Sequence, residues 1–348
     1  MNEKDRQELK DILEDTARES GLRVSGQIAE LKSPEVKQAE KEVEDWKKTK
    51  TKYNEVNEFK IPQELLRVLI ETDRHSGLIF SGEGGIGKTI LTISFIKKIL
   101  KPNEWAYSNG YTTPLALYEF LYSNRNKKIV ILDDVEGIFN NRLALSILKG
   151  ALWESDNKRI CQYSSKSDKI KFPQNFIMNA KVIILCNSIP KENDISTRAM
   201  ISRTIPYKIS FNFKQKMKIC KKFIEKDNSI KNKKKVIELL ENNITLATKD
   251  FNFRTLKKII AFVEYDEKKS DELLKATTET DEVKDAYIRA VRTEDKVKSQ
   301  IILFTELCGR GRRTFFRVKK SINDDIMTLS KDMVSKIQTD VRGCGKNG

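Results

Sequence analysis

Three short apolar runs, each rich in β-branched residues, mark the middle of the chain: 78–80, 129–132 and 182–185. Strands covered by helices on both faces are continuously apolar, whereas strands exposed on one face alternate apolar and polar residues. Helical segments separate the runs, and an amphipathic helix after residue 61 leads into the first of them. The pattern predicts an α/β domain with a parallel sheet and crossover helices, starting near residue 61.

Helical periodicity dominates the rest of the chain. Before residue 61 a short apolar stripe is followed by Ser33 and Pro34, which match the cap and first residue of a charged helix over 35–50. We expect this helix to be a solvated or subunit-bridging arm. After residue 210 helices are predicted at 214–225, 234–241, 253–265, 295–307 and 313–322. The polar, acidic stretch 266–283 predicts a loosened connection.

A glycine-rich loop follows the first apolar run and precedes a predicted helix at 90–100. It fills every fixed position of the phosphate-binding pattern G-x-x-x-x-G-K-[ST] with Gly82, Glu83, Gly84, Gly85, Ile86, Gly87, Lys88 and Thr89. The glycines let backbone N–H groups surround a β-phosphate at the positive end of a helix. Lys88 is expected to reach the β and γ oxygens, and the Thr89 hydroxyl to ligate Mg²⁺. The loop predicts ATP and Mg²⁺ as cofactors.

Two carboxylates, Asp133 and Asp134, end the second apolar run. A carboxylate at the end of a buried strand beside a phosphate loop suits the second Mg²⁺ anchor, and a second carboxylate suits activation of the attacking water. Asp133 is the candidate for the metal. Asp134 is the candidate for the water, although Asp is one methylene shorter than the commoner Glu, and Glu136 is the alternative.

The order of these motifs resembles that of the AAA+ ATPases. In that family a polar residue, often Asn, between the two phosphate strands contacts the attacking water, and Asn187 matches it. The segment 199–206 resembles the Ser-Arg segment that clamp loaders place at the subunit boundary. This implies that Arg203, with Arg198 as the local alternative, is an arginine finger for a neighbouring subunit. The segment 252–258 resembles the second sensor, which implies that Arg254 reaches the γ-phosphate from a helical lid.

The resemblance covers roughly residues 61–265 and implies a three-layer P-loop NTPase core with a parallel sheet, a helical lid, and flanking helical segments. It divides the chain into a charged helical N-terminal region, an ATPase core, a lid and a basic C-terminal region: 1–60, 61–210, 211–283 and 284–348. It also implies a homo-oligomer, a ring or spiral such as a hexamer, with ATP between subunits. The nearest members are replication initiators, helicase loaders and helicases of phages and mobile elements.

The formal net charge of +16 and the pI near 9.4 favour a polyanionic partner, because Lys and Arg release counterions from phosphate backbones. A lysine-rich proteome is the alternative explanation. Near the C-terminus, helix, glycine turn and basic helix predict a helix-turn-helix in which Phe315, Phe316 and Val318 pack against the partner helix. Its candidate DNA-binding residues are Arg310, Arg312, Arg313, Arg317, Lys319 and Lys320. A solvated basic helix in an extension of the lid is the alternative.

The sequence argues against several other classes. No apolar run approaches the roughly 20 residues of a membrane span, and the charged N-terminus does not match a secretory signal, so we expect a cytoplasmic location. Five scattered cysteines without a CxxC pair and a single histidine argue against a zinc site or a disulfide framework.

The prediction is a DNA-associated AAA+ ATPase that hydrolyses ATP between subunits and acts in replication, alongside a replication protein as partner. An ATP-gated oligomeric scaffold or switch with little turnover is the alternative, which Asp134 in place of Glu keeps open. A small-molecule kinase shares the phosphate loop but has no use for Arg203 or for the basic C-terminus.

Overall fold

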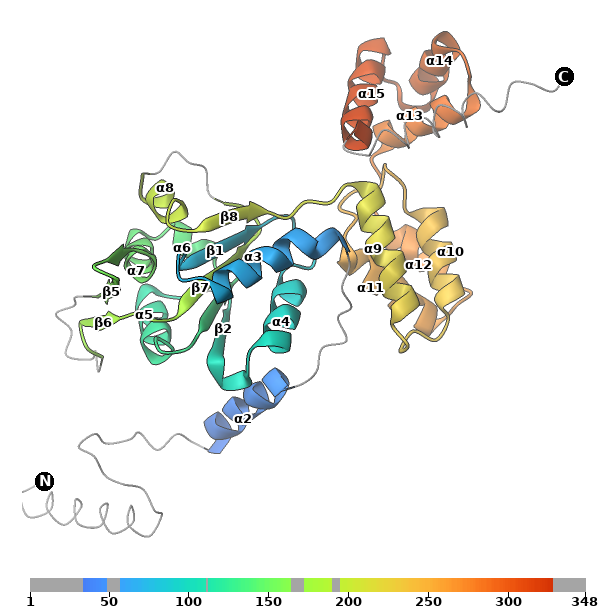
Figure 1. The fold of residues 1–348 in the computed structure, drawn as a ribbon. Coiled ribbons are helices and arrows are strands. Elements are labelled where there is room, and N and C mark those ends of the chain that lie inside the picture. Colours follow the sequence, from blue (N-terminus) through green and yellow to red (C-terminus); the bar gives the residue numbers. More distant parts are fainter. Residues whose placement is uncertain (1–33, 49–56, 111, 164–171, 190–194, 328–348) are drawn as a thin grey trace, which may run out of the picture. The chain divides into compact units, whose positions relative to one another are not determined.

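The computed structural model describes residues 34–48, 57–110, 112–163, 172–189 and 195–327 (Figure 1). The chain divides into two units, 1–49 and 50–348. Within the first unit, helix α2 (Pro34–Lys48) confirms the helix expected over 35–50. The apolar stripe expected before residue 14 and the glycine-rich C-terminal tail lie outside the described residues.

A five-stranded parallel sheet forms the centre of the second unit, in the order β2-β3-β7-β1-β8. The strands are β1 (Gly77–Ser81), β2 (Trp105–Asn109), β3 (Ile129–Asp133), β7 (Lys181–Cys186) and β8 (Ile205–Lys208). Every residue of β1 and β3 is buried, as their continuous apolar runs predicted. The α/β expectation is confirmed. The strands β2 and β8 were missed because their mixed, partly exposed sequences have no such run.

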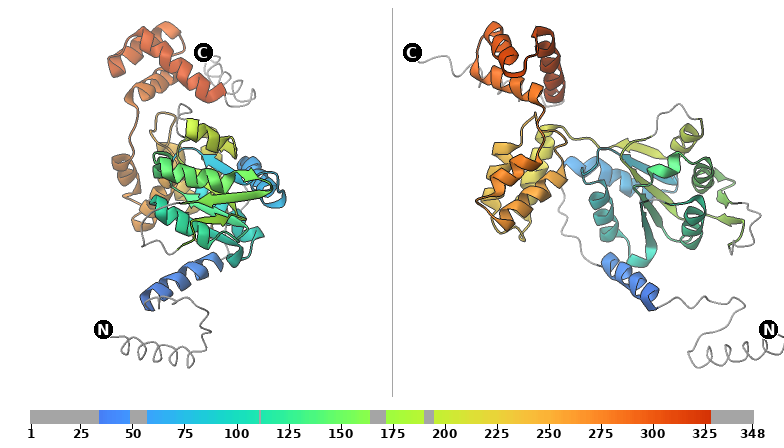
Figure 2. Two further views of the ribbon diagram at one scale, coloured as in Figure 1. Left: turned by 90° about the vertical axis from the view of Figure 1, so that its left-hand side faces the viewer. Right: turned by 180° about the vertical axis from the view of Figure 1, so that it is seen from behind.

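Helices cover both faces of this sheet (Figure 2). One face packs against α3 and α4, and the other against α5, α6, α7 and α8. Successive strand residues point to opposite faces, so Val130 and Leu132 face α5 and α7 while Ile129 and Ile131 face α3 and α4. The helices are α3 (Lys60–Glu71), α4 (Lys88–Ile99), α5 (Pro114–Ser123), α6 (Glu136–Phe139), α7 (Arg142–Leu152) and α8 (Ile195–Ile201), with 3-10 turns η1 (Asn57–Phe59) and η2 (Pro102–Glu104).

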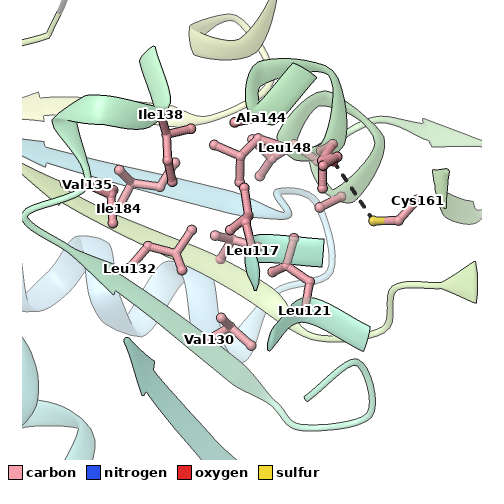
Figure 3. Close-up of a cluster of buried hydrophobic side chains, with 14 of the residues drawn as sticks. Leu117, Leu121, Val130, Leu132, Val135, Ile138, Ala144, Leu148, Cys161 and Ile184 are labelled. Carbon is pink, nitrogen blue, oxygen red and sulfur yellow. Dashed lines mark hydrogen bonds between the residues drawn. The ribbon is translucent and has the colours of Figure 1, made fainter. Parts of the chain in front are cut away.

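The core between the sheet and α5 to α7 is continuous and apolar. Figure 3 shows Val130, Leu132 and Ile184 from the sheet meeting side chains of α5, α6 and α7. Cys161 closes this cluster from a separate strand, with its thiol 4.0 Å from the Ile147 carbonyl oxygen. Burial raises the pKa of the Cys161 thiol to about 12. Cys161 therefore acts as a small apolar core residue rather than as a nucleophile.

A small antiparallel sheet lies between α7 and β7 in the chain. It was not predicted from the sequence. Its strands are β4 (Glu154–Ser155), β5 (Lys158–Gln162) and β6 (Asn175–Ile177). The buried Arg159 guanidinium donates to the carbonyl oxygens of Ala151, Asn179 and Ala180 at 2.7 to 3.0 Å. These bonds satisfy a cation that burial would otherwise make costly, and they fix the small sheet to the core.

The segment expected as a lid consists of helices with a hydrophobic cluster of their own: α9 (Phe213–Lys226), α10 (Lys233–Asn243), α11 (Phe253–Tyr265) and α12 (Ser270–Thr277). Helix α12 shows that the loosened connection expected over 266–283 was wrong. Most of its polar residues face solvent, while Ser270 and Leu274 are fully buried. Asp271 and Glu272 in its first turn favour the positive end of the helix.

The C-terminal described helices are α13 (Glu282–Thr293), α14 (Val297–Cys308) and α15 (Arg312–Met327). The expected helix, glycine turn and helix are present, with Gly309 at φ 65° ending α14. Helix α13 was not expected, and its Tyr287 packs with Phe304 and Phe315 in one buried cluster. The pair is therefore part of a three-helix bundle, and the boundary predicted at residue 284 stays a prediction. Across the described ranges, no helix is long and apolar enough to cross a membrane.

Packing of α7 gives a first prediction. Leu148 is fully buried in the sheet-facing cluster, whereas Leu143 in the same helix is exposed. We expect Leu148→Ala to lower the free energy of unfolding by about 2 to 5 kcal/mol, because it removes buried methyl groups and leaves a cavity. Leu143→Ala is the matched control and should cost less than about 1 kcal/mol. Urea denaturation followed by circular dichroism measures both, and equal losses would contradict this packing.

Candidate phosphate and metal site

The loop between β1 and α4 has the backbone geometry that wraps around a phosphate. Gly85 and Gly87 have φ of 74° and 90°, and Gly87 is the residue that precedes α4. A side chain is strained at such angles, so glycine is needed for the turn that brings backbone N–H groups to the start of the helix. The first N–H groups of a helix have no intrahelical acceptor and favour an anion.

Parallel pairing brings the polar strand ends to the edge of the sheet that carries this loop. Ser81 pairs with Cys186, and Asp133 pairs with Leu185 and Asn109. The Gly82 N–H donates to the Asn187 carbonyl oxygen at 3.2 Å. The phosphate loop, the acidic strand and Asn187 therefore share one edge.

The Lys88 ammonium is buried beside the loop and is held by three acceptors. It donates to the carbonyl oxygens of Gly82 at 2.7 Å and Glu83 at 3.0 Å, and to the Asn187 side-chain oxygen at 3.0 Å. These bonds use three directions of the ammonium and join the loop to the end of β7. Lys88 and Asn187, predicted from separate motifs, are in direct contact.

Thr89 and Asp133 also meet. The Thr89 hydroxyl donates to Asp133 Oδ2 at 2.8 Å, and the Tyr107 hydroxyl donates to the same oxygen at 2.9 Å. Burial raises the pKa of Asp133, while the hydrogen bonds from Thr89 and Tyr107 oppose that shift. Burial also raises the pKa of the Tyr107 hydroxyl, so Tyr107 stays a neutral donor.

These oxygens fit a divalent cation. Within the described residues, Asp133 Oδ1 is buried and accepts no hydrogen bond. A buried carboxylate oxygen without a donor is costly, and a hard cation such as Mg²⁺ prefers carboxylate and hydroxyl oxygens. Asp133 and Thr89 are therefore suited to hold Mg²⁺ together, and their role as its ligands stays a prediction. Tyr107 was missed because β2 has no apolar run that would have placed it next to Asp133.

Asp134 differs from Asp133 in its surroundings. Its side chain is exposed, its φ of 52° turns the chain out of the strand, and its N–H donates to the Leu185 carbonyl oxygen at 3.1 Å. Its charge raises the pKa of both Tyr107 and Asp133, so it lies close to the metal-binding oxygens. The role of Asp134, and of Glu136 as its alternative, stays a prediction.

The lid segment reaches the phosphate loop through its helix α11. The Phe253 N–H donates to the Gly85 carbonyl oxygen at 3.0 Å. A Cβ built on Gly84 would lie 3.8 Å from both Arg254 Nη1 and Asn187 Oδ1. The exposed Arg254 guanidinium is thus beside the loop, as the second-sensor resemblance implied. A second link joins Glu83 to Lys216 of α9 at 2.7 Å.

Arg203 does not join this group. It lies two residues before β8, whose Ile205 pairs with Leu78 near the beginning of β1, whereas the phosphate loop follows the end of β1. Its Nη1 donates to the Ala199 carbonyl oxygen, and its guanidinium carbon lies 6.0 Å from the Trp153 ring centre. Arg203 therefore lies at the amino-terminal ends of the strands, whereas its own phosphate loop lies at their carboxyl-terminal ends. Arg198 is exposed on α8.

Comparison with known sequences gives one distant relative. No family model matches the chain. The uncharacterized 36.7 kDa protein of the nrdC–mobD intergenic region of Enterobacteria phage T4 is 29% identical over 142 residues, 37% of this chain and 43% of the phage protein. The chain thus spans less than half the length of this relative.

Solved structures are similar at the level of the fold. The replication initiator DnaA bound to AMPPCP and single-stranded DNA has a TM-score of 0.41 and 15% identity, over 84% of this chain and 97% of that one. The Aeropyrum pernix ORC1 protein in complex with DNA has a TM-score of 0.40 and 14% identity, over 83% of each chain. Likeness at this identity concerns the fold alone.

The strand order adds the feature expected from the AAA+ resemblance. The strand β7 lies between the phosphate-loop strand β1 and the acidic strand β3, and Asn187 follows it directly. The core is an α/β domain with a five-stranded parallel sheet, the fold class that the resemblance implied. In this core the three polar features of the site end on neighbouring strands.

Aromatic residues near the phosphate loop were not predicted from the sequence. A Cβ built on Gly87 would lie 3.3 Å from the Phe253 ring and 3.6 Å from Phe59, which packs edge-on against Phe211 at 5.0 Å. Glu58 beside Phe59 pairs with Lys218 of α9 at 2.7 Å. The chain before α3 and the first lid helix thus meet next to the loop. The charged N-terminal pattern gave no signal for this contact.

Three of the basic C-terminal residues lie on one face of helix α15. Arg313, Arg317 and Lys320 are exposed and spaced by four and three residues, so they share a face of α15. Arg310 and Arg312 are exposed as well, and Lys319 is half-buried. Phe315 and Val318 are buried as expected, but Phe316 is not packed inside: it is exposed, with the Arg312 guanidinium 5.6 Å from its ring centre.

The contact between the loop and α11 gives a second prediction. A Cβ on Gly85 would lie 2.8 Å from the Asn252 side-chain oxygen, so Gly85→Ala should push the start of α11 away from the loop. We expect ATP affinity to fall by at least about tenfold, the equivalent of one displaced polar contact. Isothermal titration calorimetry with ATP and Mg²⁺ measures the effect.

Gly309→Ala is the matched control. Gly309 has a similar positive φ of 65°, but a Cβ there meets nothing within 4 Å. Both variants carry the backbone strain of a left-handed residue, about 1 to 2 kcal/mol. Only the Gly85 variant should lose ATP affinity, and equal affinities would show that this contact does not support the site.

Proposed function

We propose that this chain binds ATP with Mg²⁺, hydrolyses it in an oligomer, and acts on DNA, in replication. The observation that carries the proposal is the convergence of Lys88, Asn187 and Arg254 on one glycine loop beside the Thr89–Asp133 pair. A chance glycine-rich turn gives no reason for these groups to meet. The cofactors of the proposal are ATP and Mg²⁺.

Each group has a distinct part in the proposed reaction. The loop N–H groups and the start of α4 bind the β-phosphate, and Lys88 exchanges the loop carbonyls for phosphate oxygens. Asp133 and Thr89 would hold Mg²⁺, which when bound would neutralise negative charge on the phosphates. Asn187 orients the attacking water, and Asp134 accepts its proton. Arg254 stabilises charge on the γ-phosphate from the lid.

The position of Arg203 supports an oligomer. The strand β1 has five residues, so its ends are about 13 Å apart, and Arg203 and the phosphate loop lie at opposite ends. Arg203 cannot reach its own γ-phosphate by a side-chain rotation. We infer that it inserts into the site of a neighbouring copy, which would close only on assembly into a ring or spiral.

The proposed action on DNA rests on charge. The net charge is +16, and α15 presents Arg313, Arg317 and Lys320 along one exposed face. A basic helix face binds phosphates or enters a major groove, and its contribution depends on salt. These charges support DNA binding but do not predict which base sequence is bound, because contacts to phosphates carry no information about the bases.

A second candidate function is an ATP-gated switch with slow turnover. The observation that favours it is the exposed position and left-handed backbone of Asp134, one methylene shorter than Glu. A carboxylate that is too far from the water would allow binding and assembly while hydrolysis stays slow. Turnover measured with and without DNA separates the two candidates.

A third prediction tests hydrolysis in the oligomer. Steady-state ATPase assays should give no turnover for Lys88→Ala, and ATP binding without turnover for Arg203→Ala. An equal mixture of the two should recover activity, because an Arg203→Ala subunit keeps an intact loop that a Lys88→Ala neighbour completes with its arginine. Arg198→Ala is the control for Arg203. A mixture as inactive as its parts would exclude action between subunits.

A fourth prediction tests the DNA surface. Replacing Arg312 and Arg313 by Ala should weaken DNA binding and lower the slope of log K against log salt by about 0.9 for each phosphate that the protein no longer neutralises. The Lys257→Ala and Lys258→Ala double variant removes the same charge from an exposed pair on α11 and is the matched control. Fluorescence anisotropy with duplex DNA at several salt concentrations measures both slopes. An unchanged slope for the arginine variant would place the DNA surface elsewhere.

A further inference from the structure

Three large apolar side chains are exposed to solvent on the outer face of the small sheet. Trp153, Ile160 and Ile177 are 56%, 54% and 44% exposed. Ile160 and Ile177 pair directly across β5 and β6. The pairing of Glu154 with Arg159 places Trp153, in extended conformation just before β4, next to Ile160. We call these three residues the apolar row.

The opposite face of the same strands is buried and fixed. Arg159, Cys161 and Phe176, which alternate with the row, are all buried. A Cβ built on Gly150 would lie 2.7 Å from the Ile160 carbonyl oxygen, so β5 packs against α7 with no room for a side chain. Together with the three bonds from Arg159, this packing holds the row in place. A surface that is already ordered loses little entropy when a partner covers it.

The row continues to Arg203. The Arg203 guanidinium lies over the Trp153 ring, 6.0 Å from its centre. Its Nη1 donates to Ala199, while its Nε is buried and, among the described residues, has no hydrogen-bond partner. Trp and Arg are among the residue types that are enriched at the energetic hot spots of protein interfaces. An exposed tryptophan beside a cation also limits where that cation can point.

We propose that the apolar row is the surface that a second copy of this chain covers, and that Trp153 is a positioning residue for Arg203. The inference rests on the proposed function, in which Arg203 enters a neighbour's site. The occupant is a second copy because Arg203 lies at the sheet edge away from its own loop, so the nucleotide site it serves belongs to another copy seated beside the row. That copy offers apolar surface there, since Ile90, directly after Thr89, is exposed.

The two surfaces in this contact are different, one beside Arg203 and the other beside the phosphate loop. A contact between unlike surfaces repeats from copy to copy and builds a ring or a helical array rather than a two-fold dimer. The row would then be covered in every subunit of a closed ring. In a spiral, the row of one terminal subunit would stay uncovered.

The test compares two double-Thr variants for assembly. Ile160→Thr with Ile177→Thr keeps β-branched side chains on the strands and so preserves their strand preference. Ile302→Thr combined with Val297→Thr changes two exposed aliphatic residues of α14, 60% and 42% exposed, and is the matched control. Sedimentation velocity of the full chain with Mg²⁺ and ATPγS over a concentration series gives the dissociation constant of the assembly. We expect it to rise by at least about tenfold for the row variant and to stay unchanged for the control.

A second measurement addresses Trp153. In assembled protein, Trp153→Ala should lower kcat several-fold with KM for ATP unchanged, and Trp153→Phe should retain most of kcat, because an aromatic face still holds the guanidinium. Binding of a fluorescent ATP analogue to dilute, unassembled chains should be the same in all variants. A raised KM for ATP together with a lowered kcat in both Trp153 variants would overturn the positioning role.

The outcomes separate this inference from the proposed function. If the row variant assembles like the unchanged chain while the Lys88→Ala and Arg203→Ala mixture recovers activity, the row is overturned and the proposed function stands. If the row variant dissociates but the mixture stays inactive, the interface is supported. The insertion of Arg203 into a neighbouring copy's nucleotide site is then overturned. If the unchanged chain remains a single copy at every concentration with ATPγS, both are overturned.

Discussion

The in-register parallel pairing of β1, β7 and β3 is the constraint on which the rest of the site depends. The apolar parts of the three strands are followed by Ser81, Asn187 and Asp133, and the shared register brings these residues to the same end of the sheet. A slip of one residue between β3 and β7 would turn Asp133 to the other face of the sheet. The apolar packing on both faces therefore determines the chemistry, because it permits only one register.

Two polar groups at this edge, Lys88 and Asp133, are buried, so each must be satisfied by hydrogen-bond partners. Lys88 takes three acceptors from the loop and from Asn187, and Asp133 takes two hydroxyl donors on one oxygen. Bonds between buried groups are strong because little water competes, and a missing partner is costly for the same reason. Within the described residues Asp133 Oδ1 receives no hydrogen bond, so the network is incomplete at this oxygen.

Features that depend on local sequence were predictable, and features that depend on distant packing were not. The phosphate loop, the acidic strand and Asn187 each follow an apolar run, so both their residues and their shared edge could be inferred. Tyr107 could not, because β2 is a half-exposed strand recognisable only from its pairing with β3. Helices α12 and α13 were missed or misjudged because few large apolar residues, such as Leu274 and Tyr287, anchor otherwise polar sequences.

The hydrogen bond from the start of α11 to the phosphate loop has a mechanical consequence. Helix α11 has 13 residues and is therefore about 20 Å long. Because one end is attached to Gly85, a rotation of about 10° at that end would carry the other end through about 3 to 4 Å, by the same helix dimensions. Helix α11 is thus a lever arm, and a small change in the loop is magnified at its far end.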